Sequence, residues 1–216
     1  MNKLAKSLMK NPDYESVNVI RSAKVPLIKL VERQTNYNFD ISFNKLDGVN
    51  QLREIQKGLE YYPEMKHLLL VIKCFLKQRD LNETYSGGIG SFLLFSLVLT
   101  FLRELRREYI LDDMEEEISK LLLSELLIKF FEYYANFDIT GKQIIVAEGG
   151  AVVDKYVKDP SLSVISPQDA THDIGGSAFK AKEIFGIFKN RYHFLTNYNF
   201  GEKESILKYL FKAEYL

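Results

Sequence analysis

The 216-residue sequence has one cysteine, no tryptophan and no net charge. A lone Cys74 excludes an internal disulfide framework and a zinc site built from several cysteines, and it fits a reducing compartment. Lys and Arg total 29, and Asp and Glu also total 29, so the basic excess of a free-standing nucleic-acid-binding protein is absent. We therefore expect any RNA contact to come from a local patch or to need a partner.

Long apolar runs are missing as well. Residues 1–17 are polar and charged and contain no hydrophobic core of secretory length. The longest apolar stretch, from Phe92 to Leu102, contains Ser96 and Thr100 and is too short to span a bilayer. Hydrophobic residues still make up 46% of the chain, enough for a sizeable core. The sequence predicts a soluble, intracellular protein with no membrane partner.

The hydrophobic pattern changes from strand-like to helical near Gly48. Phe39, Ile41 and Phe43 alternate with polar residues, which is typical of a half-buried strand, and a hairpin is the simplest topology. The order of elements predicts an α+β fold that is mostly α. The predicted elements are a helix at 3–10, strands at 17–31 and 37–44, helices from about 48 to before Pro63 and at 64–79, 90–108 and 114–135, a β-hairpin at 143–157 with a Gly-Gly turn, a loop at 158–178, and helices at 179–197 and 202–213.

Asp40 is the first candidate for a functional residue. It projects from the strand face opposite Phe39 and Ile41, where a carboxylate can ligate a divalent metal for phosphoryl transfer. One carboxylate rarely makes a metal site, so a solvated strand residue is the alternative that the position alone favours.

Lys73 and Lys77 are the second candidates. They lie four residues apart on a predicted helix and therefore share one face. Two adjacent ammonium groups suit a triphosphate. From spacing alone, a solvated lysine stripe is the favoured alternative.

Two further segments could contact a nucleotide. Glycines at 87, 88 and 90 precede a helix, where backbone amides can approach a phosphate, and Phe92 could stack on a base. Close packing of a helix start requires the same glycines, so that alternative stays open. The loop at 166–176 is dense in hydrogen-bonding groups that could read a base edge, and an ordinary surface loop is its alternative. The acidic run 112–117 is expected to start a helix.

These segments, taken in order, resemble the noncanonical (Trf-type) poly(A) polymerases, a terminal nucleotidyltransferase family of the polymerase-β-like superfamily. The matches run from about residue 17 to 210 and cover nearly the whole chain. They are Val25–Lys29 and Phe39–Asn44, similar to the last two palm strands of the family; Lys73–Asn82 followed by Tyr85–Phe92, similar to its central-domain segment; Leu126–Tyr134, similar to its LLIEFFELYG helix; and Glu204–Leu207, similar to a motif near the end of its catalytic core.

The resemblance implies a fold and an activity. Residues 1–44 would be the C-terminal part of a polymerase-β-like palm, and 45–216 a helical, PAP-associated central domain with a nucleotide-recognition loop at about 158–178. The activity would be template-independent addition of AMP, or UMP, to RNA 3′ ends in RNA processing or surveillance. ATP or UTP would be the substrate, with Mg2+ or Mn2+, in the nucleus or alternatively the cytoplasm. A zinc-knuckle RNA-binding subunit would be a partner.

The resemblance also implies roles for single residues. Asp40 falls on the third metal-binding aspartate, and Gln51 lies near the ribose-contacting position. The remaining nucleotide-binding residues are Lys73 and Lys77 on the triphosphate-facing helix, Gly88 in the glycine-rich segment, Ser91 and Phe92 as the Ser-aromatic pair whose ring stacks on the incoming base, and Asp169 and His172 in the recognition loop.

The recognition loop departs from the EDP…NDVGR pattern of poly(A)-adding relatives. Ile165 and Ser166 replace the acids before Pro167, and Gly176 replaces the final Arg. His172 stands where those relatives have Asn. Uridylyl-adding relatives carry a histidine there and an acid three residues earlier, as Asp169 is here. Because a histidine donor can meet the uracil O4, we expect a preference for UTP or weak discrimination.

The N-terminal segment departs further. The family carries two more metal-binding aspartates in an Asp-x-Asp motif before the strand pair, whereas this chain has no Gly before Gly48 and only Asp13 upstream of Asp40. Metal clamping of the attacking and leaving oxygens needs more than one carboxylate. We therefore expect no polymerisation by this chain alone. The alternative from another class is a catalytically dead nucleotide- or RNA-binding scaffold module.

Overall fold

The computed structural model describes residues 1–216 except 23–24, 44–46, 112–119, 148, 199–204 and 212–216. The described residues form two compact units, Met1–Leu52 and Arg53–Leu216. The boundary falls inside helix α2 (Asp47–Tyr61). Each unit has its own three-stranded sheet.

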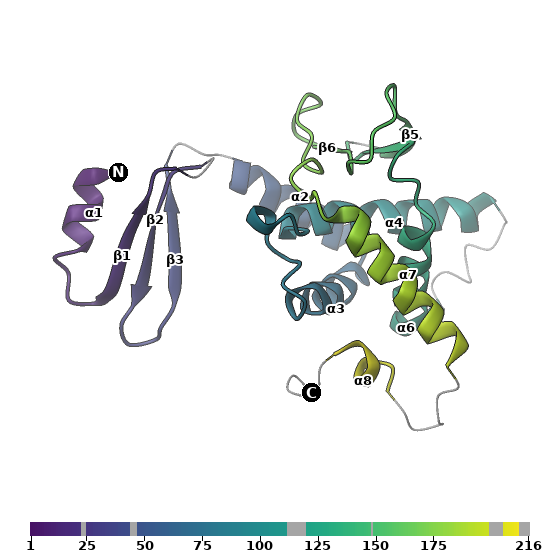
Figure 1. Ribbon diagram of the computed structural model, residues 1–216, viewed down its shortest axis with the longest axis horizontal. Coiled ribbons are helices and arrows are strands. Elements are labelled where there is room, and N and C mark those ends of the chain that lie inside the picture. Colours follow the sequence, from purple (N-terminus) through teal and green to yellow (C-terminus); the bar gives the residue numbers. More distant parts are fainter. Residues whose placement is uncertain (23–24, 44–46, 112–119, 148, 199–204, 212–216) are drawn as a thin grey trace. The chain divides into compact units, whose positions relative to one another are not determined.

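The first unit is an antiparallel sheet preceded by one short helix (Figure 1). Its central strand, β2, carries Ile28 and Leu30, the two strand side chains that are buried in this unit. The elements are α1 (Asn2–Leu8), β1 (Tyr14–Ile20), β2 (Leu27–Glu32) and β3 (Asn38–Ser42), with strand order β1-β2-β3.

The expectation of one strand over 17–31 is wrong, because this segment contains two strands. β1 ends at Ile20, and β2 begins at Leu27, directly after Pro26. Proline has no N–H to donate to a ladder, so it commonly stands at the start of a strand rather than inside one. The two strands pair antiparallel, with Val17 opposite Leu30. The predicted hairpin is therefore a three-stranded meander.

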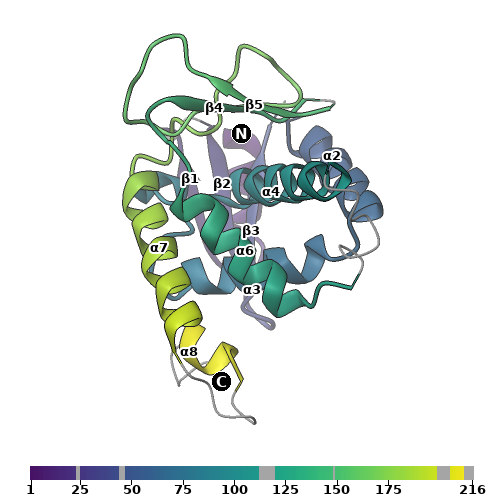
Figure 2. The same ribbon diagram turned by 90° about the vertical axis from the view of Figure 1, so that its right-hand side faces the viewer.

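The second unit is built around helix α4 (Ser91–Leu111), in which every residue from Leu93 to Leu102 is buried. A helix that is apolar on all sides is typical of the centre of a helical domain. Helix α4 contacts α3 (Met65–Lys77) and α6 (Leu123–Ala135), and α6 packs along α7 (Ala181–Asn197) (Figure 2). The predicted helices at 64–79, 90–108 and 179–197 are confirmed as α3, α4 and α7, whereas α6 covers only the later part of the helix predicted at 114–135.

Aromatic rings fill the space between these helices. Phe130 and Phe131 of α6 contact Phe188 of α7 at centroid distances of 5.6 and 5.3 Å, and Phe131 contacts Phe75 of α3 at 5.4 Å. The fully buried Tyr134 donates its hydroxyl hydrogen bond to the Leu97 carbonyl oxygen at 2.7 Å. A buried phenol needs such a partner, so the core is closed without an unsatisfied hydroxyl at this position.

A small sheet lies beside the helices. Strands β4 (Lys142–Ile145) and β5 (Ala151–Asp154) form the predicted antiparallel hairpin, which is confirmed. A third strand, β6 (Val164–Ile165), pairs parallel with β4 inside the segment predicted as a loop at 158–178. Two residues are too few to show a period-2 pattern, so the sequence gives no local signal for this strand.

Several helix boundaries differ from the expected ones. Helix α6 begins at Leu123, not at 114, and residues 112–119 with the acidic run lie outside the described residues. The Glu125 carboxylate accepts the N–H of Leu122 at 2.7 Å, which caps the true start. The last predicted helix, 202–213, is described only as α8 (Leu207–Leu210). A short 3-10 helix, η1 (Thr84–Ser86), lies between α3 and α4. No described helix is long and apolar enough to cross a membrane.

Candidate nucleotide-binding site

Asp40 lies on β3 directly opposite Lys29 of β2. The Asp40 Oδ2 atom is 3.7 Å from Lys29 Nζ, and both side chains are 55% exposed. Among the residues that the structure describes, no group of three His, Cys, Asp or Glu side chains is placed to hold a metal ion. A single exposed carboxylate paired with a lysine does not fit a divalent metal, so the described residues do not by themselves form the expected metal site.

Gln51 and the two lysines lie on helix surfaces. Gln51 is half-buried on α2, in the first unit. Lys73 and Lys77 are both exposed on α3, while Ile72, Phe75 and Leu76 of the same helix are fully buried. The structure therefore confirms that the two lysines share a solvent-facing side of α3.

The glycine-rich segment is closed on itself. The N–H of Gly88 donates to Glu83 O at 2.9 Å, and the N–H of Ile89 donates to Leu81 O at 2.8 Å. A Cβ at Gly88 would lie 2.3 Å from Leu81 O, a distance that real Cβ atoms do not show. The Gly88 amide is therefore already used inside the turn. The geometry supports the packing alternative for this glycine.

Ser91 and Phe92 open helix α4. Ser91 is exposed at its first position, and Phe92 is half-buried. The Phe92 ring stacks on Phe95, with centroids 5.8 Å apart and planes inclined by 20°. Phe95 is buried, so it supports the Phe92 ring from the core side.

The predicted recognition loop is organised by its own hydrogen bonds. The Asp169 carboxylate accepts the N–H and the hydroxyl of Thr171 at 2.8 and 2.6 Å. The Thr171 hydroxyl first, and then its N–H, hold the pKa of the Asp169 carboxyl below its usual value. The N–H of His172 donates to Asp169 O at 3.0 Å, and its carbonyl accepts the N–H of Ser166 at 2.9 Å. The His172 side chain is exposed, so its backbone is fixed while its imidazole faces solvent.

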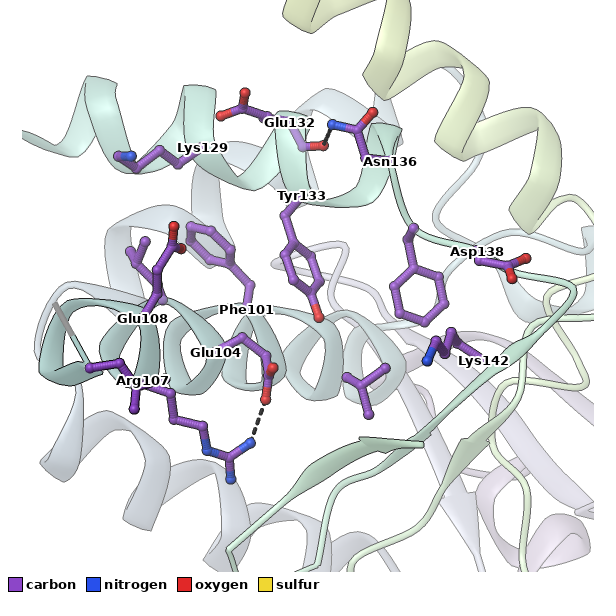
Figure 3. Close-up of a pocket in the computed structure, with 14 residues that line it drawn as sticks. Phe101, Glu104, Arg107, Glu108, Lys129, Glu132, Tyr133, Asn136, Asp138 and Lys142 are labelled. Carbon is purple, nitrogen blue, oxygen red and sulfur yellow. Dashed lines mark hydrogen bonds and ion pairs between the residues drawn. The ribbon is translucent and has the colours of Figure 1, made fainter. Parts of the chain in front are cut away.

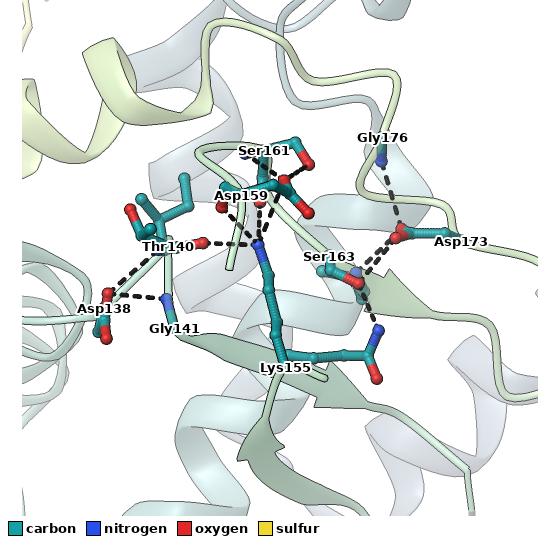
Figure 4. A network of polar contacts seen from close by, with 12 residues as sticks. Asp138, Thr140, Gly141, Lys155, Asp159, Ser161, Ser163, Asp173 and Gly176 are labelled. Atoms are coloured by element: carbon teal, nitrogen blue, oxygen red, sulfur yellow. Dashed lines mark hydrogen bonds and ion pairs between the residues drawn. The ribbon is translucent and has the colours of Figure 1, made fainter. Parts of the chain in front are cut away.

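Asp173 is a residue that the sequence interpretation did not single out. Its Oδ1 accepts the N–H groups of Val164, Gly175 and Gly176 at 3.0, 2.7 and 3.3 Å. Its Oδ2 accepts the Ser163 hydroxyl at 2.7 Å, and Figure 4 shows this cluster beside β6. An Asp followed two residues later by glycine is a typical turn pattern, and this was the available signal.

Lys155 forms the other polar cluster in Figure 4. Its side chain is only 4% exposed. Its Nζ donates to the carbonyl oxygens of Ile139, Asp159 and Ser161 at 2.8, 3.0 and 2.6 Å, and lies 3.6 Å from the Asp159 carboxylate. Lys155 therefore fastens the segment after β5 to the turn before β4.

A hydrogen bond joins two of the predicted segments. The N–H of Lys180 donates to Gly87 O at 3.0 Å, and the Phe179 ring lies where a Cβ of Gly87 would stand. Gly87 has φ +82°, in the region that glycine favours. The glycine-rich segment thus contacts the chain just beyond the recognition loop.

A cavity of about 830 Å³ lies elsewhere, between α4, α6 and the β4-β5 hairpin (Figure 3). Its charged lining includes Glu104, which is paired with Arg107, and Lys142, which is paired with Asp154 at 2.8 Å. Burial, followed by the Glu104 charge, raises the pKa of the Tyr133 phenol well above its usual value. None of the predicted nucleotide-binding residues lines this cavity, so it is separate from the candidate site.

Several known proteins are similar to this chain in sequence. A family described as the central palm domain of mitochondrial-like poly(A) RNA polymerase matches residues 1–56. The poly(A) RNA polymerase CID14 of Cryptococcus neoformans is 32% identical over 94% of this chain and 27% of its own length. The Drosophila melanogaster protein Trf4-2, named as an inactive noncanonical poly(A) RNA polymerase, is 32% identical over 77% of this chain and 43% of its own length. The chain therefore spans less than half the length of these curated relatives.

Solved structures agree. The polymerase core of TRAMP, an RNA surveillance complex, aligns with a TM-score of 0.79 and 27% identity over 97% of this chain and 69% of its own. The Cid1 poly(U) polymerase with Mg and 3′-dATP aligns with a TM-score of 0.71 and 17% identity over 92% of this chain and 73% of its own, a likeness of fold alone. The fold is that of polymerase-β-like nucleotidyltransferases. Within that class, the chain belongs to the noncanonical, Trf-type poly(A) polymerase family.

Proposed function

We propose that this chain is the nucleotide-binding part of an enzyme that adds ribonucleotides to RNA 3′ ends without a template. The observation that carries the proposal is the exposed pair Lys73 and Lys77 on α3, in a chain whose relatives are named poly(A) RNA polymerases. Neither ammonium group forms an ion pair within the described part of the chain. Both are therefore available to a triphosphate, the ligand whose charge two adjacent lysines match.

A binding experiment on the 216-residue chain tests this proposal. We expect ATP or UTP, with Mg2+, to bind, and the double variant Lys73→Met/Lys77→Met to raise the dissociation constant about tenfold or more, since each charged hydrogen bond contributes about 1.5–3 kcal/mol. Lys66→Met is the matched control, because Lys66 is exposed on the same helix about 10 Å from Lys73 along its axis. Equal weakening by Lys66→Met, or no binding by the unmodified chain, would contradict the proposal.

Nucleotidyl transfer needs more metal-binding groups than the described residues supply. Asp40 is one exposed carboxylate, and two-metal phosphoryl transfer requires a shared set of ligands. We expect no primer extension by the purified 216-residue chain with either Mg2+ or Mn2+. Extension by this chain alone would refute that expectation. Extension by a longer protein that contains this chain, lost in Asp40→Asn, would support Asp40 as a metal ligand.

The alternative is a nucleotide-binding scaffold without catalysis. Two observations favour it: the missing metal-ligand group among the described residues, and a relative named as inactive. Both functions predict nucleotide binding by the 216-residue chain. Only the first predicts primer extension by a longer protein that contains this chain together with further metal-binding carboxylates, so that assay separates the two.

The nucleotide is proposed to be ATP or UTP, with the choice made at His172. Hydrogen bonds hold the His172 backbone while its imidazole is exposed. A ring N–H can therefore donate a hydrogen bond to the uracil O4. We expect His172→Asn to shift preference from UTP toward ATP in a competition assay. A strong ATP preference in the unmodified chain that His172→Asn leaves unchanged would rule out this role.

RNA is proposed to be held with a partner subunit. Proteins that bind nucleic acids gain most of their affinity from Lys and Arg side chains that contact the phosphate backbone. This chain has no net positive charge to supply such contacts over a wide surface. The solved polymerase core that resembles this chain belongs to a complex. A zinc-knuckle RNA-binding subunit would supply the missing positive charge. We expect RNA binding by the chain alone to be weak and to strengthen at low salt, as a mobility-shift titration can measure.

A further inference from the structure

The Asp173 carboxylate stands at the junction of β6 and the loop at 166–176 (Figure 4). It accepts four hydrogen bonds, three from N–H groups and one from the Ser163 hydroxyl. The Ser163 hydroxyl oxygen in turn accepts from Gln143 Nε2 at 2.6 Å, and Gln143 belongs to β4. One side chain thus ties the end of the loop to two strands.

These contacts bear on the residue just before Asp173. Asp173 forms a β-bridge with Ile165, and the neighbouring His172 carbonyl accepts the N–H of Ser166 at 2.9 Å. The His172 N–H is held by Asp169 O at 3.0 Å. The His172 peptide groups are therefore fixed on both sides, although the side chains of residues 168–173 are all exposed. With little apolar burial in this stretch, hydrogen bonds rather than packing fix the His172 backbone from which the imidazole projects.

An amide at position 173 could not reproduce the arrangement. Asparagine has one acceptor oxygen where aspartate has two, and its NH2 group would face the Ser163 hydroxyl. Because that hydroxyl already accepts from Gln143, its own proton would lose its acceptor. The carboxylate also makes charge-assisted hydrogen bonds, which are stronger than those of an amide.

We propose that Asp173 is a positioning residue that places His172 and thereby determines which base the loop accepts. The proposal rests on the proposed nucleotide-binding function of the loop. Asp173 acts through its neighbour: its carboxylate is occupied by protein donors, whereas the His172 imidazole is the group exposed to a base.

Asp138 offers a matched control in the same unit. Its Oδ1 accepts the N–H groups of Thr140 and Gly141 at 3.1 and 2.9 Å, in a turn before β4 and outside the loop. Asp138→Asn therefore makes the same chemical change, in the same kind of turn, without touching the contacts of His172. Ser163→Ala is an intermediate variant, because it removes one of the four hydrogen bonds of Asp173 and keeps the carboxylate.

The test measures two properties of the 216-residue chain and its variants. The first is hydrogen–deuterium exchange of the amides at 164 and 175–176, and the second is the ratio of the dissociation constants for ATP and UTP. In Asp173→Asn we expect faster exchange and a ratio that moves about tenfold toward unity, while the affinity for inorganic triphosphate is unchanged. Ser163→Ala should show smaller changes of both kinds, and Asp138→Asn should show neither. A general loss of folding would weaken all ligands together, so the triphosphate measurement separates positioning from a merely structural role.

Two results would overturn the inference. One is an Asp173→Asn chain in which the ratio of the dissociation constants for ATP and UTP is unchanged, and the other is an Asp138→Asn chain that changes the ratio equally. Failure of the proposed nucleotide-binding function gives a distinguishable result. The unmodified chain would then bind neither ATP nor UTP, and the proposed effect of Asp173 on base selectivity would fall with it. Faster exchange in Asp173→Asn would then show only that the carboxylate holds the amides of Val164, Gly175 and Gly176.

Discussion

The N–H of Lys180 donates a hydrogen bond to the carbonyl oxygen of Gly87 at 3.0 Å. It connects the glycine-rich turn before α4 with the start of α7, two segments that lie far apart in the sequence. The loop predicted to recognise the nucleotide ends just before Lys180, so the turn and this loop share a support. Substitutions that distort the turn should therefore lower the free energy of unfolding.

The tight turn at Gly88 gives the first prediction. A Cβ there would lie 2.3 Å from Leu81 O and 3.0 Å from Glu83 N, both backbone atoms that cannot move independently. We expect Gly88→Ala to lower the free energy of unfolding by about 1–3 kcal/mol, measured by urea denaturation. Gly176→Ala is the control, because no atom lies within 4 Å of its added Cβ. Equal stability of the two variants would show that the turn relaxes at no cost.

Lys155 gives the second prediction. Lys155→Met removes a buried ammonium group and leaves three carbonyl oxygens without that donor. We expect the free energy of unfolding to fall by roughly 2–5 kcal/mol, because unsatisfied buried groups keep their desolvation cost. Lys158→Met, at an exposed position three residues later, should change stability little. If both variants unfold at the same denaturant concentration, Lys155 is not the anchor that its contacts indicate.

Much of the fold follows from local patterns, whereas the polar supports do not. Helices α3 and α7 and the Gly-Gly hairpin could be predicted because each carries its own periodicity or turn signal. Strand β6 could not, since its two residues pair with a strand about 20 positions away. The candidate site also divides into predictable and unpredictable parts. The exposed pair Lys73 and Lys77 was predictable from helical spacing.

The role of Asp173 was not predictable, because it depends on Ser163 and Gln143 being brought beside it by the pairing of β4 and β6. Composition also gives no sign that Lys155 is buried, since lysine is usually exposed. Asp40 shows the opposite limit. Its position on β3 was predicted, but a metal site requires partners, and the described residues do not supply them.

Acid sensitivity of the loop at 166–176 gives the third prediction. The Thr171 hydroxyl and N–H keep the pKa of the Asp169 carboxyl below its usual value. A carboxyl group whose pKa is lower in the folded than in the unfolded protein stabilises the fold. This stabilisation is fully present at pH values above the unfolded pKa, about 3.9, and is lost as the pH falls through the folded pKa. We therefore expect the loop amides to exchange faster, relative to the intrinsic rate, as the pH is lowered below about 4.

Thr171→Val tests the cause of this acid sensitivity. It removes the hydroxyl donor and keeps the N–H, so the acid-induced change should become smaller. Thr140→Val is the control, because the Asp138 carboxylate in that turn accepts the Thr140 N–H rather than its hydroxyl. An acid response that is identical in all three chains would mean that other carboxyl groups control the loop.

Phe92 and Phe95 give the last prediction, because stacked rings on one helix have different surroundings. Phe92 is half-buried at the start of α4, and Phe95 is 1% exposed in the core. Phe92→Leu keeps apolar contact with Phe95 but removes the aromatic face.

If Phe92 stacks on the incoming base, this variant should bind ATP and UTP about tenfold more weakly, because base stacking contributes about 1–3 kcal/mol. Its melting temperature should change little. Phe95→Leu should show the reverse, a lower melting temperature and nearly unchanged binding, because core packing is lost at a site that no ligand reaches. Titration calorimetry and thermal unfolding of both variants measure the two effects. A lower melting temperature with unchanged nucleotide binding in Phe92→Leu would assign Phe92 to the core instead of the base.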